Sequence, residues 1–189
     1  ITEDFEAYEP FSDNMSPWQL IDADGAQKTY GFADVTFSHM GQAMSYIIFK
    51  PSALGVDPQA NPNAAAPSGE QYAISFDAVP QYAKNGHSDD WPISPRLSGR
   101  EQTIKLKAGL LTSNYGAETF DVLYSTTDSA QSSFQLLETE RPSAAGWTEY
   151  EVTLPEDARF FALRHTTPNG LSLAFDDVSF EGASQPVTG

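Results

Sequence analysis

Residues 20–26 read LIDADGA, where Asp22 and Asp24 form a D-x-D-G pattern that can bind a cation or simply close a turn. An EF-hand loop would need glycine at its sixth position and a bidentate glutamate at its twelfth. Counting from Asp22, these positions hold Gln27 and Ala33, and no flanking helices are predicted. The EF-hand is therefore excluded.

Calcium can also be bound by oxygens from distant segments, because the ion takes six to eight oxygen ligands. The acidic candidates for such a composite site are Glu6, Asp22, Asp24 and the Asp176–Asp177 pair. Aspartate also closes turns with its own side chain. Composition alone therefore favours plain turns and leaves the calcium site open.

Other chemistry has little support. The histidines His39, His87 and His165 are too scattered for a zinc motif, and His165 alternates with core positions, so we predict that it is buried and hydrogen-bonded. There is no cysteine, G-x-S-x-G elbow, P-loop or dinucleotide glycine pattern. Glu138 and Glu140 share one face of a predicted strand, which is more typical of solvent-facing charge than of a glycosidase pair. We predict that the protein is not an enzyme.

Sugar rings stack on aromatic faces, and Trp18, Trp91 and Trp147 each stand beside polar turns. A tryptophan at the end of a strand more often belongs to the edge of the core. We predict core-edge positions for all three.

Composition limits the partners. The chain has 189 residues, with 26 acidic and 10 basic side chains and a net charge of -16. This charge argues against nucleic acid and anionic lipid, and favours cations, neutral glycans or basic protein surfaces. No run of 18 apolar residues occurs, so no membrane insertion is expected. The absence of cysteine is consistent with exported bacterial proteins that lack disulfides.

The elements that position these residues are predicted to be strands. Short stretches with period-two alternation are typical of half-buried antiparallel strands. They occur at 72–78, 103–111, 119–126 and 149–155, and further strands are expected at 44–51, 134–140, 160–166, 171–180 and the N-terminus. Nine to eleven strands predict an all-β protein with two packed sheets.

One predicted strand changes its own alternation. In LSLAFDDVSF, the odd-numbered Leu173 and Phe175 would face one side of a regular strand, whereas the even-numbered Val178 and Phe180 would face the other. A β-bulge at Asp176–Asp177 would bring both sets to one core, and the alternative is that both faces are buried. We predict the bulge.

A single domain is predicted over residues 1–182. The proline- and alanine-rich segment 51–69 is predicted to be a long loop inserted into it, because strands of similar character flank it. Residues 183–189 are predicted to form a linker or tail.

Eight motifs in order resemble the cleaved adhesin family, the gingipain-type haemagglutinin/adhesin modules and related choice-of-anchor J domains of Bacteroidetes. They are DFE, WQLIDADG, DDWPISPRL, TFDVLYSTT, F-x-LLE, GWTEYEVTLP, FFALRHT and LAFDDVSF, from about residue 3 to 182. The family usually has D-x-D-G-D-G-x-x-W and D-N-[WY]-L-I-[ST]-P. Here the first motif lacks its second Asp-Gly and its tryptophan, and the second has become DDWPISP.

The resemblance implies a jelly-roll β-sandwich of two antiparallel sheets, related to MAM domains and other galactose-binding-like folds, with first and last strands side by side. It also implies structural Ca²⁺ held by Glu6, Asp22, Asp24 and Asp176. The expected function is that of a secreted or cell-surface, non-catalytic adhesion module that binds glycans or extracellular proteins. It would be a monomeric module of a larger protein. The alternatives are a structural spacer and a glycoside-active enzyme built on a jelly roll.

Overall fold

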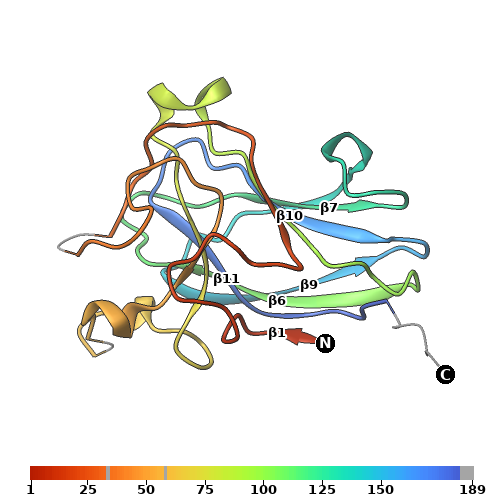
Figure 1. Ribbon diagram of the computed structural model, residues 1–189, viewed down its shortest axis with the longest axis horizontal. Helices are drawn as coiled ribbons and strands as arrows, with labels where there is room; N and C mark the ends of the chain where they lie inside the picture. Colours follow the sequence, from red (N-terminus) through yellow and green to blue (C-terminus); the bar gives the residue numbers. More distant parts are fainter. Residues whose placement is uncertain (33–34, 58, 184–189) are drawn as a thin grey trace.

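The computed structural model describes residues 1–32, 35–57 and 59–183, which form eleven strands and five short 3₁₀-helices (Figure 1). The first sheet has the order β3 (Ile47–Phe49), β4 (Tyr72–Phe76), β11 (Ser172–Ser179), β6 (Gln102–Leu110) and β9 (Gly146–Leu154). β1 (Thr2–Glu3) also pairs with β11. All these pairings are antiparallel, as the alternating sequence predicts.

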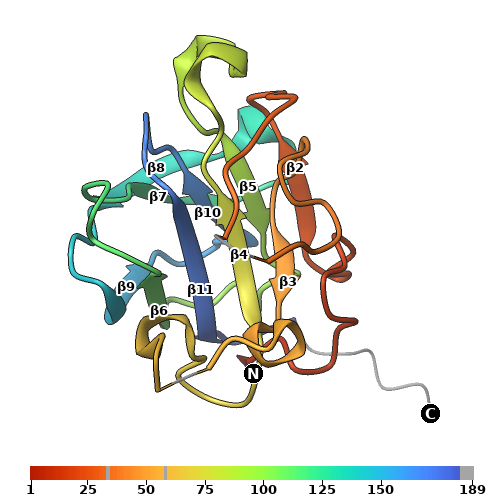
Figure 2. The same cartoon turned by 90° about the vertical axis from the view of Figure 1, so that its left-hand side faces the viewer.

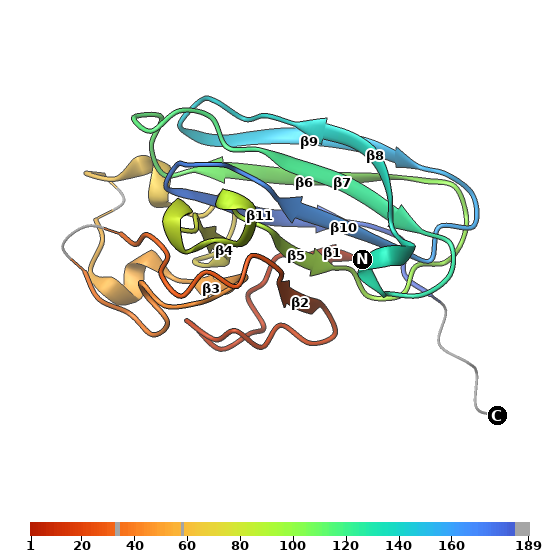
Figure 3. The same cartoon turned by 90° about the horizontal axis from the view of Figure 1, so that it is seen from above.

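The second sheet is also antiparallel and lies against the first. Its order is β2 (Gln19–Asp22), β5 (Asp90–Ile93), β10 (Phe160–His165), β7 (Phe120–Ser125) and β8 (Gln135–Glu140). Figure 1 shows β7 and β10 in one layer above β6, β9 and β11, and Figure 3 looks onto the second sheet. The 3₁₀-helices lie in the connections: η1 (Pro51–Leu54), η2 (Pro62–Ala64), η3 (Pro80–Tyr82), η4 (Lys84–Gly86) and η5 (Gln131–Ser133).

The main core fills the space between the two sheets. Large apolar side chains from both layers are fully buried there, including Leu106, Val152, Phe120 and Phe161. Burying each such side chain contributes about 1.5–3 kcal/mol. The predicted all-β jelly-roll sandwich is confirmed. Within the described residues, no helix has the length and apolar character needed to cross a membrane.

The predicted bulge in β11 is confirmed. The pairing of β11 with β6 shifts register between Asp176 and Ser179, and Asp177 has a φ of 48°. This shift brings Phe175 and Val178 into the same core despite their opposite parity. β1 pairs with β11 just past the bulge, at Val178 and Ser179, so the first and last strands lie side by side as expected.

The structure corrects the prediction that the strand at 72–78 is half-buried. Every residue of β4 is buried, and Figure 2 shows the strand between β3 and β11. Its apolar side chains Tyr72, Ile74 and Phe76 pack in a second cluster on the far side of the first sheet. The polar residues Ser75, within this strand, and Asp77, directly after it, therefore also lie in the interior, with no exposed surface.

Two short strands, β2 and β5, were not predicted, because neither shows a clear alternation. The inserted segment 51–69 contains η1 and η2. It is attached to the first sheet by Trp147, whose Nε1 donates a 2.8 Å hydrogen bond to the carbonyl of Ala65. The predicted tail at 183–189 lies outside the described residues except for Ala183.

The three tryptophans are packed into the protein, as predicted. Trp18 is 5% exposed and makes edge contacts with Phe161 and Phe180. Trp91 is buried beneath Arg164, and Trp147 packs edge-on against Tyr72. None of them offers an open stacking platform for a sugar.

Candidate functional site

Asp22, Asp24 and Asp90 form a close carboxylate cluster. Asp22 ends β2 and pairs with Asp90, the first residue of β5. The turn after β2 brings Asp24 to the same place, so that one carboxylate oxygen from each residue lies within 4.8 Å of the others. Two backbone N–H groups, from Ala26 and Asp89, fix Asp24 by donating 2.8 Å hydrogen bonds to its carboxylate. This set of oxygen donors suits Ca²⁺.

The electrostatics of this cluster favour a bound cation. Burial, followed by the neighbouring Asp24 carboxylate, raises the pKa of Asp22 to about 6. Burial and the charges of Asp24 and Asp22 raise the pKa of Asp90 well above its usual value. A cation would relieve this repulsion, because an opposite charge favours the ionised form of each carboxylate.

A second acidic group surrounds the bulge of β11. Asp176 is fully buried; its Oδ1 accepts a 2.8 Å hydrogen bond from the N–H of Asp177, and its Oδ2 has no partner among the described residues. Burial raises the pKa of Asp176 to about 8, and the charges of Asp177, Glu6 and Asp4 add to the rise. Glu6 and Asp176, both expected to bind calcium, are therefore close enough for the charge of Glu6 to affect the pKa of Asp176.

Glu6 is anchored to the segment that leads into β4. Its Oε1 accepts hydrogen bonds from the backbone N–H groups of Glu70 (2.5 Å) and Gln71 (3.1 Å). Gly69 permits this approach, because a side chain there would collide with the Glu6 carboxylate. Gly69 also has a φ of 62°, in the left-handed region that favours glycine.

The four predicted calcium ligands are thus divided between the two ends of β4. Glu6 contacts the chain just before Tyr72, whereas the cluster of Asp22 and Asp24 is tied to Ser75, whose hydroxyl donates a 3.1 Å hydrogen bond to Asp90. The sequence reasoning missed Asp90. The feature of the sequence that could have indicated Asp90 is the pair of aspartates at the start of DDWPISP.

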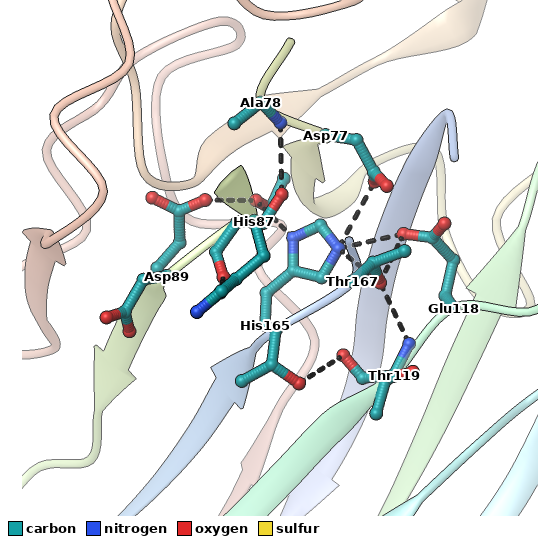
Figure 4. A network of polar contacts seen from close by, with 12 residues as sticks. Asp77, Ala78, His87, Asp89, Glu118, Thr119, His165 and Thr167 are labelled. Atoms are coloured by element: carbon teal, nitrogen blue, oxygen red, sulfur yellow. Dashed lines mark hydrogen bonds and ion pairs between the residues drawn. The ribbon is translucent and has the colours of Figure 1, made fainter. Parts of the chain in front are cut away.

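His165, the last residue of β10, connects this cluster to a further pair of buried acids (Figure 4). Its Nε2 lies 2.8 Å from Oε1 of Glu118 and 3.2 Å from Oδ1 of Asp77. Its Nδ1 lies 2.8 Å from Oγ of Ser75. The prediction of a buried, hydrogen-bonded histidine is confirmed.

Asp77 and Glu118 were also missed by the sequence reasoning. Asp77 follows β4 and Glu118 precedes β7, so the two carboxylates are 41 positions apart and meet only in the folded protein. Both are closed off from solvent together with His165. Burial raises the pKa of Glu118 to about 8, with the Asp77 carboxyl adding to the rise.

A cavity of about 380 Å³ opens beside this buried group, lined by Tyr30, Gly31, Tyr115, Asn169, Gly170 and Leu171. Tyr115 is 63% exposed. The hydroxyl of Tyr30 donates a 3.4 Å hydrogen bond to Oδ1 of Asn169. The cavity therefore combines two tyrosine rings with an amide side chain, groups that can contact a polar ligand with an apolar face.

The fold is a jelly-roll β-sandwich of the adhesin type. The chain belongs to the cleaved adhesin family: the profile of the Cleaved Adhesin Domain matches residues 4–180. The resemblance seen in the eight sequence motifs is confirmed. No curated protein matches the chain.

Solved structures with the same fold include adhesin domains of Lys-gingipain. The K2 cleaved adhesin domain superposes with a TM-score of 0.70 at 20% identity, covering 95% of this chain and 96% of that one. The K1 domain from Porphyromonas gingivalis W83 gives 0.68 at 19% identity, covering 97% and 98%. The K3 domain from the same organism gives 0.64 at 20% identity, covering 94% and 95%. These chains are similar to this protein over nearly their full length.

Proposed function

We propose that the protein is a non-catalytic, extracellular adhesion module that binds glycans or extracellular proteins and is stabilised by calcium. Membership of the cleaved adhesin family supports the adhesive role. The net charge of -16 disfavours nucleic acid and anionic lipid as partners, and it leaves neutral glycans and basic protein surfaces as compatible ligands.

The cavity beside Tyr115 carries the glycan proposal. Sugar rings present an apolar face that packs on aromatic rings and hydroxyl groups that hydrogen-bond to amides. Tyr30 and Tyr115 provide the rings, and Asn169 provides the amide. A volume of about 380 Å³ lies within the range of small-molecule sites.

A glycan array probed with the wild-type protein and with Tyr115→Ala tests this site. Because Tyr115 is 63% exposed, its truncation should leave folding intact and weaken binding at least tenfold. Tyr82→Ala, at another exposed tyrosine, should bind as the wild type does. The absence of any glycan hit would favour a structural spacer, and capture of an extracellular protein without glycan would favour a protein ligand.

The calcium proposal rests on the two acidic groups. The buried Oδ2 of Asp176 lacks a partner among the described residues, and Asp22, Asp24 and Asp90 offer converging oxygens, so both groups fit a cation that takes oxygen ligands. A ligand that binds only the folded state stabilises it by RT ln(1 + [Ca]/Kd), about 2.7 kcal/mol at a hundredfold excess over Kd.

A calcium chelator should therefore lower the melting temperature, and added Ca²⁺ should restore it. Asp176→Ala should reduce this response. An identical melting temperature with chelator and with excess Ca²⁺ would rule out structural calcium while leaving the glycan proposal untouched.

A further inference from the structure

The buried triad of Asp77, Glu118 and His165 carries more negative charge than its protein contacts neutralise. Asp77 and His165 have no exposed surface, and Glu118 is 2% exposed. Among the described residues, the ion-pair partner of both carboxylates is His165. Neither oxygen of Asp77 receives a hydrogen bond with good geometry from that part of the chain. A buried carboxylate without sufficient partners is costly.

The hydrogen bonds of Ser75 suit an imidazole that carries hydrogen on Nδ1. The hydroxyl of Ser75 donates to Oδ2 of Asp90, which leaves the Ser75 oxygen free to accept a hydrogen bond from a protonated Nδ1 of His165, 2.8 Å away. In a neutral imidazole with hydrogen on Nδ1, the Nε2 atom is an acceptor. This Nε2 faces Oδ1 of Asp77 and Oε1 of Glu118, which are also acceptors. The hydroxyl of Thr167 also lies 3.1 Å from Nε2, but its hydrogen is directed to Oε1 of Glu118, and Asp77 receives none. A positive charge between these atoms would neutralise the carboxylates.

A proton or a metal ion can supply that charge, and the two differ in amount. A proton on Nε2 adds one positive charge against two carboxylates. A divalent cation adds two positive charges, neutralises both carboxylates and gives Asp77 a positive partner. From this geometry we propose that Asp77, Glu118 and His165 bind a divalent transition-metal ion, with Zn²⁺ as the best match.

The ligand types support zinc over calcium. Zn²⁺ binds imidazole nitrogen together with carboxylate oxygen, whereas Ca²⁺ prefers oxygen ligands alone. Four ligand atoms at about 2.0 Å from a tetrahedral zinc ion lie roughly 3.3 Å apart. The contact from Nε2 of His165 to Asp77, at 3.2 Å, matches this spacing, and the contact to Glu118, at 2.8 Å, is about 0.5 Å shorter.

The surrounding hydrogen bonds are those that orient metal ligands. A metal-binding histidine usually donates its other N–H to a protein acceptor, which holds the ring in place. Here Nδ1 of His165 lies 2.8 Å from the Ser75 oxygen, and the Ser75 hydroxyl in turn donates a hydrogen bond to Asp90. On the other side, the hydroxyl of Thr167 donates a 3.1 Å hydrogen bond to Oε1 of Glu118.

Gly170 lies between the triad and the cavity. This residue lines the cavity of about 380 Å³. A Cβ atom at Gly170 would collide with Oε2 of Glu118 and lie 2.8 Å from Oδ2 of Asp77. The two carboxylates therefore lie directly beneath a residue without a side chain, which separates them from the cavity.

The test uses the full chain after removal of metals with a chelator. Competition with a chelator of known affinity measures how much Zn²⁺ the protein binds and how tightly. We expect one tight site, weakened about 100-fold or more by Asp77→Asn or Glu118→Gln. His87→Gln, which removes a partly exposed histidine outside the triad, should bind Zn²⁺ as tightly as the wild type.

Nitrogen NMR of His165 in the wild type keeps the proposal falsifiable if a variant fails to fold. Added Zn²⁺ should shift the Nε2 signal to that of a metal-bound imidazole and leave Nδ1 protonated. An Nε2 that stays protonated in excess Zn²⁺, or a tight site unchanged in both carboxylate variants, would overturn the proposal. Neither result depends on glycan binding or on calcium.

Discussion

The Nε2 atom of His165 lies 2.8 Å from Oε1 of Glu118, and both side chains are closed off from solvent. His165 ends β10, and Glu118 stands just before β7, the strand that pairs with β10. Their contact therefore joins the ends of two neighbouring strands at the interior of the sandwich. Removing one partner leaves the other group buried without its attraction, which is more costly than losing an exposed pair.

In metal-free protein, His165→Gln should lower the free energy of unfolding by about 3–5 kcal/mol, the range for breaking a buried ion pair, because it leaves the buried carboxyl groups of Asp77 and Glu118 without a positive partner. Urea denaturation in the presence of a chelator measures this loss. Glu156→Gln, at an exposed position after β9, should change stability by no more than about 0.5 kcal/mol. Equal small effects of the two substitutions would show that the buried contact contributes little.

The sequence predicted those features that depend on local alternation. The change of parity around Asp176 predicted the bulge, because apolar side chains on both sides of it had to reach one core. The position of His165 among core residues predicted its burial. The order of eight motifs predicted the family and, through it, the jelly roll.

What the sequence could not predict depends on contacts between distant segments. Ser75 and Asp77 occupy the polar positions of an alternating strand, a pattern that usually faces solvent. They are buried because the second sheet covers them and His165 and Asp90 supply polar partners. The grouping of Asp22 with Asp90 likewise depends on the pairing of β2 with β5, two strands too short to be recognised.

Gly109 of β6 lies opposite Trp147 of β9, and the indole covers the missing side chain. A Cβ atom at Gly109 would lie 2.8 Å from Cε3 of Trp147, so the ring would have to move. We expect Gly109→Ala to cost about 1–3 kcal/mol, as overpacking usually does. In a Trp147→Ala background the same substitution should cost almost nothing. Additive effects in this double-mutant cycle, measured by urea denaturation, would show that the ring does not restrict Gly109.

Glu140 should make stability depend on pH. Burial and the neighbouring Glu138 raise its pKa from 4.5 to about 7. Between pH 4.5 and about 7, the folded state therefore binds more protons than the unfolded state. The stabilisation that comes from protonated Glu140 is present below pH 4.5 and is lost as pH rises towards 7. Glu140→Gln should therefore be more stable than the wild type near pH 8, with the difference shrinking near pH 4. The exposed Glu156→Gln should show no such trend in denaturation curves, and a pH-independent gain in Glu140→Gln would exclude this mechanism.

The separation of Asp22 and Asp176 at opposite ends of β4 predicts two independent calcium responses. With saturating Ca²⁺, Asp22→Asn and Asp176→Asn should each lower the free energy of unfolding, and the double variant should show their sum within about 0.5 kcal/mol. With a chelator, Asp22→Asn should become neutral or stabilising, because it removes repulsion from Asp24 while no ion is lost. Asp13→Asn, at an exposed aspartate, should behave the same in both conditions. A strongly non-additive double variant would instead indicate that Asp22 and Asp176 bind one shared ion. We expect additivity, because each of the two carboxylate groups has its own buried oxygen without a hydrogen-bond partner among the described residues.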